Sequence, residues 1–322
     1  MATHLARHEH AKVLFNHEVV SLGQDGKKAW VSARTPDGEK RMFATYIVGC
    51  DGGSSTIRRE LLGRDSFPGM TWSNMIVATN VYYPRFQREF LGRDHWTSTT
   101  FFVSPEHSPM VAQMAKDGLL RITYQEDGSL SRDEMRKRLP GKFKTFVPGS
   151  PDGSEYEVVD FSPYRIHQRC AERLRLGRFV LAEDAAHLCN PYGGMGLTGG
   201  IADVGGLYDC LYGIFPGQAD DSILDKYEEV RRAKYWSVID PISTGNLKRL
   251  MESSPEATEK DTFFNALKMA AAEEPGPTSR DMIQVRSFLG ERLVPMLTFA
   301  QKGVNAVMYD FTQHYDKNLD RR

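Results

Sequence analysis

The stretch from Gly177 to Leu197 constrains the fold of this chain more than any other. It contains Gly-Arg-Phe-Val-Leu-Ala-Glu-Asp-Ala-Ala-His and then Asn-Pro-Tyr-Gly-Gly-Met-Gly-Leu. The apolar residues over 177–184 predict a buried strand that carries Asp184 at its C-terminal tip. The glycines that follow predict a turn, and residues 195–213 predict a helix. Such a unit presents a carboxylate and free backbone N–H groups to a polar, partly anionic ligand.

A purely structural interpretation of this stretch competes with a ligand site. Asp184 would then cap a helix, and the glycines would allow close packing. A ligand site is favoured because Asp184 directly follows Glu183, and a structural site avoids two adjoining carboxylates at a strand tip. Pro191 also stiffens the approach to the turn. The glycines exceed what one tight turn needs, and each weakens a helix start; they are Gly193, Gly194, Gly196, Gly199 and Gly200.

The N-terminal residues predict three strands and a helix. The strands lie over 12–22, 28–35 and 41–49. Thr35-Pro-Asp-Gly38 is a predicted turn, because proline fixes φ and glycine accepts positive φ. The third strand runs into Cys50-Asp-Gly-Gly-Ser-Ser-Thr56, and a helical pattern begins at Ser55.

Between about residues 70 and 165 the pattern changes to short apolar segments separated by Pro and Gly turns. These segments predict a mostly antiparallel sheet, with strands over 74–82, 99–103, 110–114 and 119–124. Ser131 followed by Glu134 is a capping-box pattern, which predicts a helix over 131–139. The C-terminal third is predicted to be helical over 223–239, 263–272 and about 283–309, with a linker at 274–277.

Composition excludes several classes of partner and site. The chain has 322 residues, of which 40% are hydrophobic, and a formal net charge of −1. This balance gives no reason to expect nucleic acid or an anionic membrane surface as a partner. The four cysteines lie far apart without a C-x-x-C pair, which argues against zinc or a disulfide framework and favours a reducing, cytoplasmic compartment. The polar N-terminus is not a signal peptide, and no apolar run is long enough to span a membrane.

Two motifs and their order resemble a known family. The pattern Gly-Arg-Phe-Val-Leu-Ala-x-Asp-Ala-Ala-His followed by Pro-x-Gly-Gly-x-Gly resembles the second flavin-binding motif of FAD-dependent aromatic monooxygenases, the para-hydroxybenzoate-hydroxylase-like group. Val48-Gly-Cys-Asp-Gly-Gly-Ser-Ser-Thr-Ile-Arg58, about 130 residues earlier, resembles that family's other internal motif. Tyr227-Glu-Glu-Val-Arg-Arg232 resembles the helix after the second motif, so the resemblance covers about residues 10–250.

The resemblance implies an α/β (α+β) fold and a flavin-dependent activity. The fold would be a truncated Rossmann-like lobe for FAD and NAD(P), with an inserted, mostly antiparallel sheet domain and C-terminal helices. The lobe would comprise residues 1–69 and 166–250, the substrate-binding sheet 70–165 and a helical segment 251–322. The implied reaction is hydroxylation of an aromatic or related electron-rich small molecule, with NAD(P)H as reductant, through a flavin C4a-hydroperoxide.

The resemblance also assigns roles in cofactor binding, but no catalytic side chain. Asp184 would hydrogen-bond the ribityl chain of FAD. Backbone N–H groups at the following helix start would face N1 and O2 of the ring, where the helix dipole stabilises the anionic reduced flavin. Asp51 and Arg58 would lie near the pyrophosphate and the approach of the nicotinamide cofactor. The segment beside the isoalloxazine ring would comprise Pro191, Gly193, Gly194, Met195, Gly196 and Leu197.

Two departures from the family set further expectations. Glu183 occupies the place of the family's glycine before the motif aspartate, which narrows the space beside the cofactor and adds a negative charge. Residues 1–60 contain no Gly-x-Gly-x-x-Gly at a strand-to-helix junction, the unit that holds the FAD pyrophosphate in the family. Its loss would weaken FAD binding and expose an apolar sheet edge. A homodimer partner, a second polypeptide or rearranged terminal segments would cover that edge.

Two other classes of function stay open, as does an inactive fragment. A non-catalytic partner subunit would complete its sheet with another chain, and a short polypeptide bearing Gly-x-Gly-x-x-Gly would then co-purify with it. A flavin-free descendant would keep the substrate sheet and catalyse a non-redox cyclisation, dehydration or isomerisation, active without flavin. Its candidate acid–base groups are His187, Glu183, Tyr164 and His167.

Overall fold

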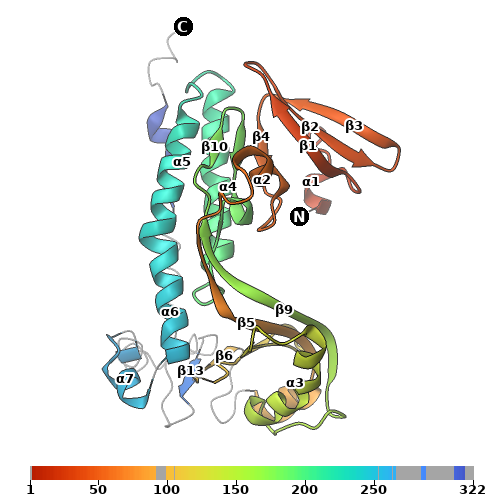
Figure 1. The fold of residues 1–322 in the computed structure, drawn as a ribbon, viewed down its shortest axis with the longest axis vertical. Coiled ribbons are helices and arrows are strands. Elements are labelled where there is room, and N and C mark those ends of the chain that lie inside the picture. Colours follow the sequence, from red (N-terminus) through yellow and green to blue (C-terminus); the bar gives the residue numbers. More distant parts are fainter. Residues whose placement is uncertain are drawn as a thin grey trace.

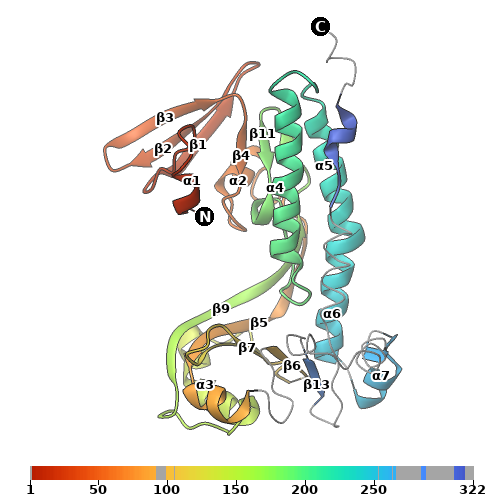
Figure 2. The ribbon, with the colours of Figure 1, turned by 180° about the vertical axis from the view of Figure 1, so that it is seen from behind.

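Two long antiparallel strands link the two parts of the molecule (Figures 1 and 2). Strands β5 (Gly69–Tyr82) and β9 (Glu157–Cys170) pair along most of their length, with Ile76 opposite Tyr164. Because both strands belong to the larger sheet at one end and reach the smaller sheet at the other, they fix the orientation of the two parts. The computed structural model describes residues 2–91, 99–104, 106–252, 254–262, 264–265, 284–287 and 308–315.

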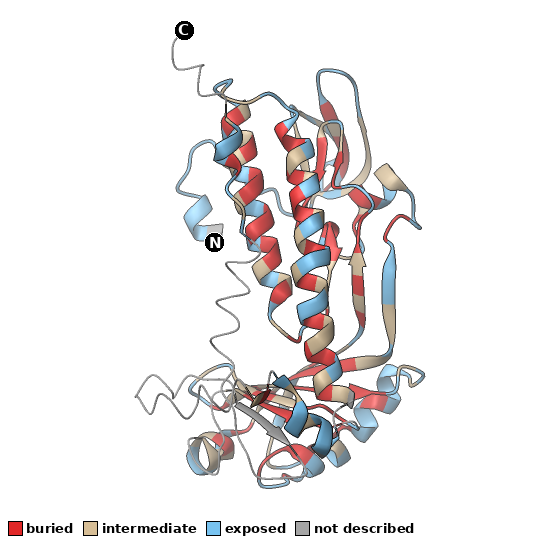
Figure 3. Ribbon diagram, turned by 90° about the vertical axis from the view of Figure 1, so that its left-hand side faces the viewer, coloured by how far each residue is buried: buried red, intermediate tan, exposed pale blue. Residues whose placement is uncertain are grey.

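One continuous helical rod runs beside these strands from one part to the other (Figure 1). It consists of α5 (Ile223–Lys234), a π-helical turn η3 (Tyr235–Ile239) and α6 (Asp240–Glu252). The predicted helix over 223–239 is therefore confirmed, and the rod extends beyond it. Buried and exposed bands alternate along the long helices in Figure 3, as expected when one face of each helix covers a core.

A small sheet with a parallel strand pair forms the centre of the first part. The order of its strands is β10 (Arg175–Leu176), β11 (Phe179–Leu181) and β4 (Ile47–Gly49), and β11 runs parallel to β4. All three residues of β11 are buried and form a core with apolar residues of the neighbouring helices α2 (Thr56–Leu62) and α4 (Met195–Ile214). Within the described residues β4 is the outer strand of this sheet.

The single strand predicted over 41–49 is wrong, because two strands in two different sheets occupy this stretch. Residues Gly38–Ala44 form β3, which pairs with β2 (Ala29–Thr35), whereas the next residues turn and Ile47–Gly49 form β4. Most of β3 is exposed, as suits an outer antiparallel strand, while the short apolar β4 suits a buried parallel pair. Residues 41–49 are therefore divided between an exposed antiparallel strand and a more buried parallel strand.

An antiparallel sheet of three strands, β1–β2–β3, projects beside the parallel strands. Its first strand, β1 (Glu18–Gln24), begins later than the predicted strand over 12–22. The predicted turn at Thr35–Gly38 is confirmed. The Thr35 hydroxyl donates to the Gly38 carbonyl, and Gly38 has a φ of +107°, which explains the glycine.

The second part is built on a sheet of seven strands in the order β12-β9-β5-β8-β7-β6-β13. The antiparallel pairing predicted for residues 70–165 is confirmed from β9 through β6. The remaining strands are β6 (Thr99–Val103), β7 (Met110–Gln113), β8 (Leu119–Glu126), β12 (His187–Leu188) and β13 (Gln284–Ser287).

The helix predicted over about 283–309 is wrong where the structure describes it. Gln284–Ser287 form strand β13, which pairs in parallel with β6. Residues 288–307 lie outside the described residues, as do most of those in the helix predicted over 263–272. Val285 is the one apolar residue of this strand, so pairing with β6 and not the sequence pattern decides the conformation.

Different helices cover the two faces of the large sheet. Helix α3 (Arg132–Phe146) covers one face, and its capping box between Ser131 and Glu134 confirms the predicted helix start. The helical rod covers the other face, where Leu247 of α6 packs against Ile76 of β5. Side chains that alternate along β5 therefore belong to two separate cores.

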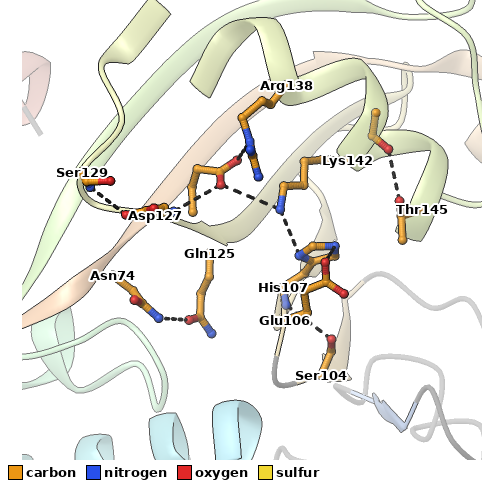
Figure 4. A network of polar contacts seen from close by, with 12 residues as sticks. Asn74, Ser104, Glu106, His107, Gln125, Asp127, Ser129, Arg138, Lys142 and Thr145 are labelled. Atoms are coloured by element: carbon orange, nitrogen blue, oxygen red, sulfur yellow. Dashed lines mark hydrogen bonds and ion pairs between the residues drawn. The ribbon is translucent and has the colours of Figure 1, made fainter. Parts of the chain in front are cut away.

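A polar network fastens α3 to the sheet (Figure 4). The Glu126 side chain is 2% exposed and accepts a hydrogen bond from Arg138 at 3.2 Å, with Lys142 3.8 Å away. Lys142 also contacts His107 Nδ1 at 3.2 Å. Burial lowers the pKa of His107, and the neighbouring Lys142 lowers it further. These groups lie under α3, on the sheet face that the helical rod does not cover.

Short elements complete the described chain. They are α1 (Ala2–Leu5), η1 (Phe86–Phe90), α7 (Pro255–Lys260) and η5 (Phe311–His314). Phe311 of η5 is fully buried against Gly206 of α4, where a Cβ atom would clash with its ring. Among the helices described here, none has both the length and the apolar character that crossing a bilayer requires.

Candidate functional site

The two glycine-containing motifs meet at a cavity of about 650 Å³. The turn after β4 contributes Gly53 and Ser54, and strand β9 contributes residues 164–167. The cavity therefore lies where the small sheet meets the large one. The chain between β11 and the first turn of α4 supplies the rest of the wall, namely Asp184, Leu188, Cys189, Asn190, Pro191, Gly194, Gly196 and Leu197.

The glycine turn leaves the start of α4 open to this cavity. Gly194, the N-cap residue, has a φ of +65°, and a Cβ atom built there would meet nothing within 4 Å. Because glycine has no side chain to cap the helix, the first N–H groups of α4 have no side-chain acceptor at the N-cap. Gly196 and Leu197 of this first turn line the cavity. The helix dipole adds partial positive charge at the same place.

Two predicted residues of the turn face the helical rod and not the cavity. A Cβ atom on Gly193 would lie 3.0 Å from the Asn246 amide nitrogen of α6. Met195 is 2% exposed and packs with Tyr235 and Ile239. These two residues anchor the turn to the rod, while Pro191, Gly194, Gly196 and Leu197 form its cavity side.

Asp184 lies in a 3-10 turn and not at the tip of a strand. The predicted strand over 177–184 ends at Leu181, and Glu183–Ala185 form the turn η2. The strand ends there because Glu183 adopts a left-handed conformation with a φ of +56°. The Asp184 carboxylate is exposed and lines the cavity.

The side chain of Glu183 points toward helix α4. Its Cγ atom lies 3.1 Å from the position that a Cβ atom on Gly200 would take, so Gly200 leaves room for it. Glu183 does not line the cavity. The left-handed backbone explains why a glycine suits position 183. The Glu183 side chain fits there because it lies against Gly200 of α4 and not in the cavity.

A buried carboxylate beneath the turn holds it in place. Asp203 of α4 accepts hydrogen bonds from the backbone N–H of Glu183 at 2.9 Å and from Arg231 Nε at 2.6 Å, and contacts His187 Nε2 at 2.8 Å. Burial alone would raise the pKa of Asp203, but His187 and Arg231 hold it below its ordinary value. Sequence reasoning missed Asp203 and Arg231, although an acid among the small and apolar residues at the middle of α4 was a usable indication.

Asp51 and Arg58 are engaged in contacts that tie the two motifs together. Asp51 accepts a hydrogen bond from the backbone N–H of Ile57 at 3.0 Å. The Arg58 guanidinium donates to the carbonyls of Gly53 at 2.6 Å and Ala185 at 2.8 Å, and burial lowers its pKa. Neither side chain lines the cavity, so their roles toward pyrophosphate and nicotinamide stay predictions.

Strand β9 brings an aromatic and a basic side chain to the cavity. Tyr164 and His167 line it, together with Ile166. His167 Nδ1 contacts the Thr71 hydroxyl at 2.9 Å, so the other ring nitrogen is the atom left for a ligand. Burial lowers the pKa of His167, and Arg169 and Arg165 lower it further. Of the four predicted acid–base groups, two therefore line the cavity, whereas Glu183 and His187 do not.

Some buried polar atoms of the structure have no hydrogen-bond partner. Within the described residues they include the Tyr192 hydroxyl, Trp72 Nε1 and Gln125 Nε2. Tyr192 and Trp72 belong to the same apolar cluster as Ile166, which lines the cavity. Buried polar atoms without partners are rare in proteins, and neither Tyr192 nor Trp72 lines the cavity.

Cys189 is a poor candidate for a reactive thiol. It lines the cavity next to the glycine turn, but burial and the nearby Asp184 raise its pKa to about 12. The thiolate, which is the nucleophilic form, is then scarce at neutral pH.

Comparisons with known proteins agree with one another. Residues 1–241 match the family described as FAD binding domain. The chain is 34% identical over 291 residues to para-nitrophenol 4-monooxygenase of Pseudomonas sp. (strain WBC-3), covering 90% of this chain and 70% of that protein. It is 38% identical over 220 residues to 6-hydroxy-3-succinoylpyridine 3-monooxygenase HspB of Pseudomonas putida (strain DSM 28022 / S16), covering 68% and 53%.

Structural comparison gives a further p-nitrophenol 4-monooxygenase. The crystal structure of p-nitrophenol 4-monooxygenase PnpA from Pseudomonas putida DLL-E4 superposes with a TM-score of 0.76 at 34% sequence identity. The superposition covers 82% of this chain and 65% of that one. The chain thus spans between 53% and 70% of the length of these three relatives.

Proposed function

The chain belongs to the FAD-dependent aromatic hydroxylase family, and from this premise we propose that it takes part in the FAD- and NAD(P)H-dependent hydroxylation of an aromatic small molecule. The observation that carries the proposal is the cavity, at which the two family motifs and the large sheet meet. Its volume of about 650 Å³ falls within the range of small-molecule sites.

The residues around the cavity fit the ring and the ribityl end of FAD. The open start of α4 offers N–H donors and positive potential to an electron-rich ring edge. Gly194 and Gly196 let a flat ring approach the backbone closely, since neither carries a side chain. Asp184 offers an exposed carboxylate to hydroxyl groups of the ribityl chain. Bound FAD would supply the redox chemistry, namely reduction by NAD(P)H and activation of O2.

The chain's own side chains would hold the cofactor and orient the substrate. Asp184 would accept hydrogen bonds from the ribityl hydroxyls, and Asp203 would hold the turn that presents Asp184. Pro191 keeps the turn in shape when the cavity fills. Across the cavity wall, His167 would exchange a hydrogen bond with the substrate through its free ring nitrogen, since Thr71 occupies Nδ1.

We propose a hydroxylated aromatic ring as the substrate class. The names of the relatives describe action on a nitrophenol and on a hydroxypyridine, which share a ring hydroxyl. The wall formed by Tyr164 and Ile166 suits an aromatic ring.

Titration with FAD tests this proposal. The wild-type chain is expected to quench FAD fluorescence on binding and to shift the flavin absorbance. Asp184→Ala is expected to weaken binding roughly 10- to 100-fold, because hydrogen bonds to a charged group are worth about 1.5–3 kcal/mol. Asp65→Ala is the matched control, since Asp65 is exposed and lies outside the cavity wall.

Oxidation of NAD(P)H stimulated by p-nitrophenol would then test the reaction itself. Equal FAD affinity of Asp184→Ala and Asp65→Ala would remove Asp184 from the cofactor site. A wild-type chain that neither binds FAD nor oxidises NAD(P)H, but converts a phenol without flavin, would replace the proposal with the flavin-free alternative.

A further inference from the structure

Three side chains of the paired strands β5 and β9 form a chain of hydrogen bonds that ends at the cavity. Thr71 of β5 lies opposite His167 of β9, and Arg169 follows two residues later on the same face of β9. Arg169 Nη2 donates to the Thr71 hydroxyl at 3.0 Å, and this hydroxyl contacts His167 Nδ1 at 2.9 Å. Of the three side chains, only that of His167 lines the cavity.

The Arg169 guanidinium is held in place by a second hydrogen bond. Its Nη1 donates to the Phe67 carbonyl at 2.6 Å, two residues before β5 begins. The strands approach closely here, because a Cβ atom on Gly69, which lies opposite Arg169, would be 2.1 Å from the Gln168 carbonyl oxygen. A guanidinium has N–H donors and no acceptor, so the Thr71 oxygen has to accept from it.

This contact decides the direction of the hydrogen bond between Thr71 and His167. A hydroxyl has a single proton, and within the described residues His167 Nδ1 is the one acceptor that the Thr71 proton reaches. If Nδ1 carried a proton instead, the Thr71 oxygen would accept two N–H groups and its own proton would have no acceptor among the described residues. Donation from Arg169 also polarises the hydroxyl and makes it a better donor. Nδ1 is therefore the acceptor.

The ring nitrogen left for a ligand then carries the proton. Burial, and after it Arg169 and Arg165, lower the pKa of His167, so its imidazole is neutral at pH 7. A neutral imidazole has one N–H, which lies on Nε2 when Nδ1 is the acceptor. Arg165, which also lines the cavity, adds positive charge on the same strand, whereas the Asp184 carboxylate belongs to the turn η2.

We propose that Thr71 and Arg169 are positioning residues that fix the His167 proton on Nε2, so that this wall selects aromatic ligands with an ionised ring oxygen. An equally large ligand with a hydrogen-bond donor in place of that oxygen would set two donors against each other. Tyr164 also lines the cavity, but its hydroxyl can donate or accept and does not discriminate. The aromatic ligand is the substrate class of the proposed function, on which this inference rests.

Binding of two probes of similar size tests the selectivity. They are p-nitrophenolate, with an ionised oxygen, and p-nitroaniline, with an amino group at the same ring position. Calorimetric titration at a pH at which the phenol is ionised is expected to show roughly tenfold tighter binding of p-nitrophenolate by the wild-type chain.

Variants of the two positioning residues are expected to gain affinity for p-nitroaniline. In Thr71→Val the ring is free to move its proton to Nδ1 and to accept from the amino group through Nε2, so binding of p-nitroaniline should tighten roughly threefold or more. Arg169→Met, which frees the Thr71 oxygen to accept, should show the same gain. Damage to the strand alone would weaken both probes. Thr71→Ser should behave like the wild-type chain, as should Thr145→Val, the matched control on the exposed side of α3.

Nitrogen-15 NMR of the histidine rings reads the tautomer directly, and His167→Gln identifies the signal. The wild-type ring is expected to keep its proton on Nε2 with either probe, whereas in Thr71→Val p-nitroaniline should move it to Nδ1. A proton on Nδ1 in the wild-type chain, equal affinity for the two probes, or weaker binding of both by Thr71→Val would overturn the inference.

Both measurements are made without FAD, which separates this inference from the proposed function. The expected tautomer and selectivity support the inference even if the FAD titration fails. A wild-type chain that binds FAD but carries the His167 proton on Nδ1 overturns the inference and leaves the proposed function standing.

Discussion

Two buried carboxylates, Asp203 in the first part of the molecule and Glu126 in the second, are paired in different ways. Asp203 is 0% exposed, and its hydrogen-bond donors include Arg231, which is 1% exposed. Glu126 is similarly buried, but its partner Arg138 has a side chain that is 52% exposed. The Asp203 pair is sealed from water, whereas the Glu126 pair opens to water through Arg138, which Figure 4 labels on α3.

The difference relates to what each carboxylate holds. Asp203 accepts a hydrogen bond from the backbone of Glu183, so it fixes the turn that presents Asp184 to the cavity. Glu126 bonds to side chains of α3 and fixes how a helix packs on a sheet. We infer that the sealed pair supports the site, while the open pair supports the fold.

The largest effect is expected from Asp203→Asn. The change removes the carboxylate that faces buried Arg231 while keeping the shape of the side chain. Breaking a buried pair on one side typically destabilises by about 3–5 kcal/mol. Urea unfolding of the variant is expected to show this loss, together with weaker binding of FAD.

The control is Asp225→Asn. Asp225 forms an ion pair with Arg175, and the Asp225 side chain is 62% exposed. It should lose far less stability than Asp203→Asn, because exposed pairs are worth little. Equal losses in the two variants would contradict the idea that sealing from water makes the Asp203 pair important.

Glu126→Gln is expected to have a smaller effect. Arg138 can turn to solvent when the carboxylate disappears, so only Lys142, with a side chain that is 12% exposed, keeps a poorly compensated charge. We expect a loss of about 1–2 kcal/mol in the free energy of unfolding. FAD binding should not change, since Glu126 does not line the cavity. A loss of FAD affinity would contradict the separation of the two networks.

The two networks should also differ in their response to pH. The pKa of His107 is lowered in the folded state, so the unfolded chain takes up a proton first. Neutral His107 therefore contributes no loss of folding stability above about pH 6.5. As the pH falls from there toward the folded-state pKa, the free energy of unfolding decreases, because the unfolded chain binds the proton more readily than the folded chain. The pKa of Asp203 is also lowered, but its contribution is lost only below about pH 4, the ordinary range of an aspartate.

Urea unfolding at pH 7 and pH 5 measures this difference. The wild-type chain is expected to lose up to about 1 kcal/mol more than His107→Gln over this interval. Identical pH dependence of the two proteins would show that His107 titrates alike in the folded and unfolded states.

The sequence predicted most of the cavity but not what holds it. Proline and glycine mark the turn at residues 191–197 directly, because few other residues accept its backbone conformations. Asp203 lies 16 residues from His187 and 28 from Arg231, so only the folded chain brings them together. The left-handed backbone at Glu183 could not be predicted either, because a glutamate in the sequence gives no indication of positive φ.

Strand boundaries were missed for a related reason. The apolar run over 41–49 does not say that a turn divides it between two sheets, because the choice depends on β2 and β11 as partners. Likewise, Gln284–Ser287 form a strand because β6 offers an edge. The domain boundaries at residues 69, 165 and 250 stay predictions.

The smallest expected effect concerns the turn that Asp203 holds. Glu183→Gly relieves a left-handed conformation that costs a non-glycine residue about 1–2 kcal/mol. The added freedom of glycine in the unfolded chain offsets about 0.5–1 kcal/mol of this, so a net gain of roughly 0.5 kcal/mol in the free energy of unfolding is expected.

Gly194→Ala should lower the free energy of unfolding, because alanine is strained at the positive φ of this residue and its Cβ atom would gain no contact in return. Thermal unfolding measures both, and a lower melting temperature for Glu183→Gly would show that the Glu183 side chain, packed against Gly200, stabilises the turn more than its backbone strains it.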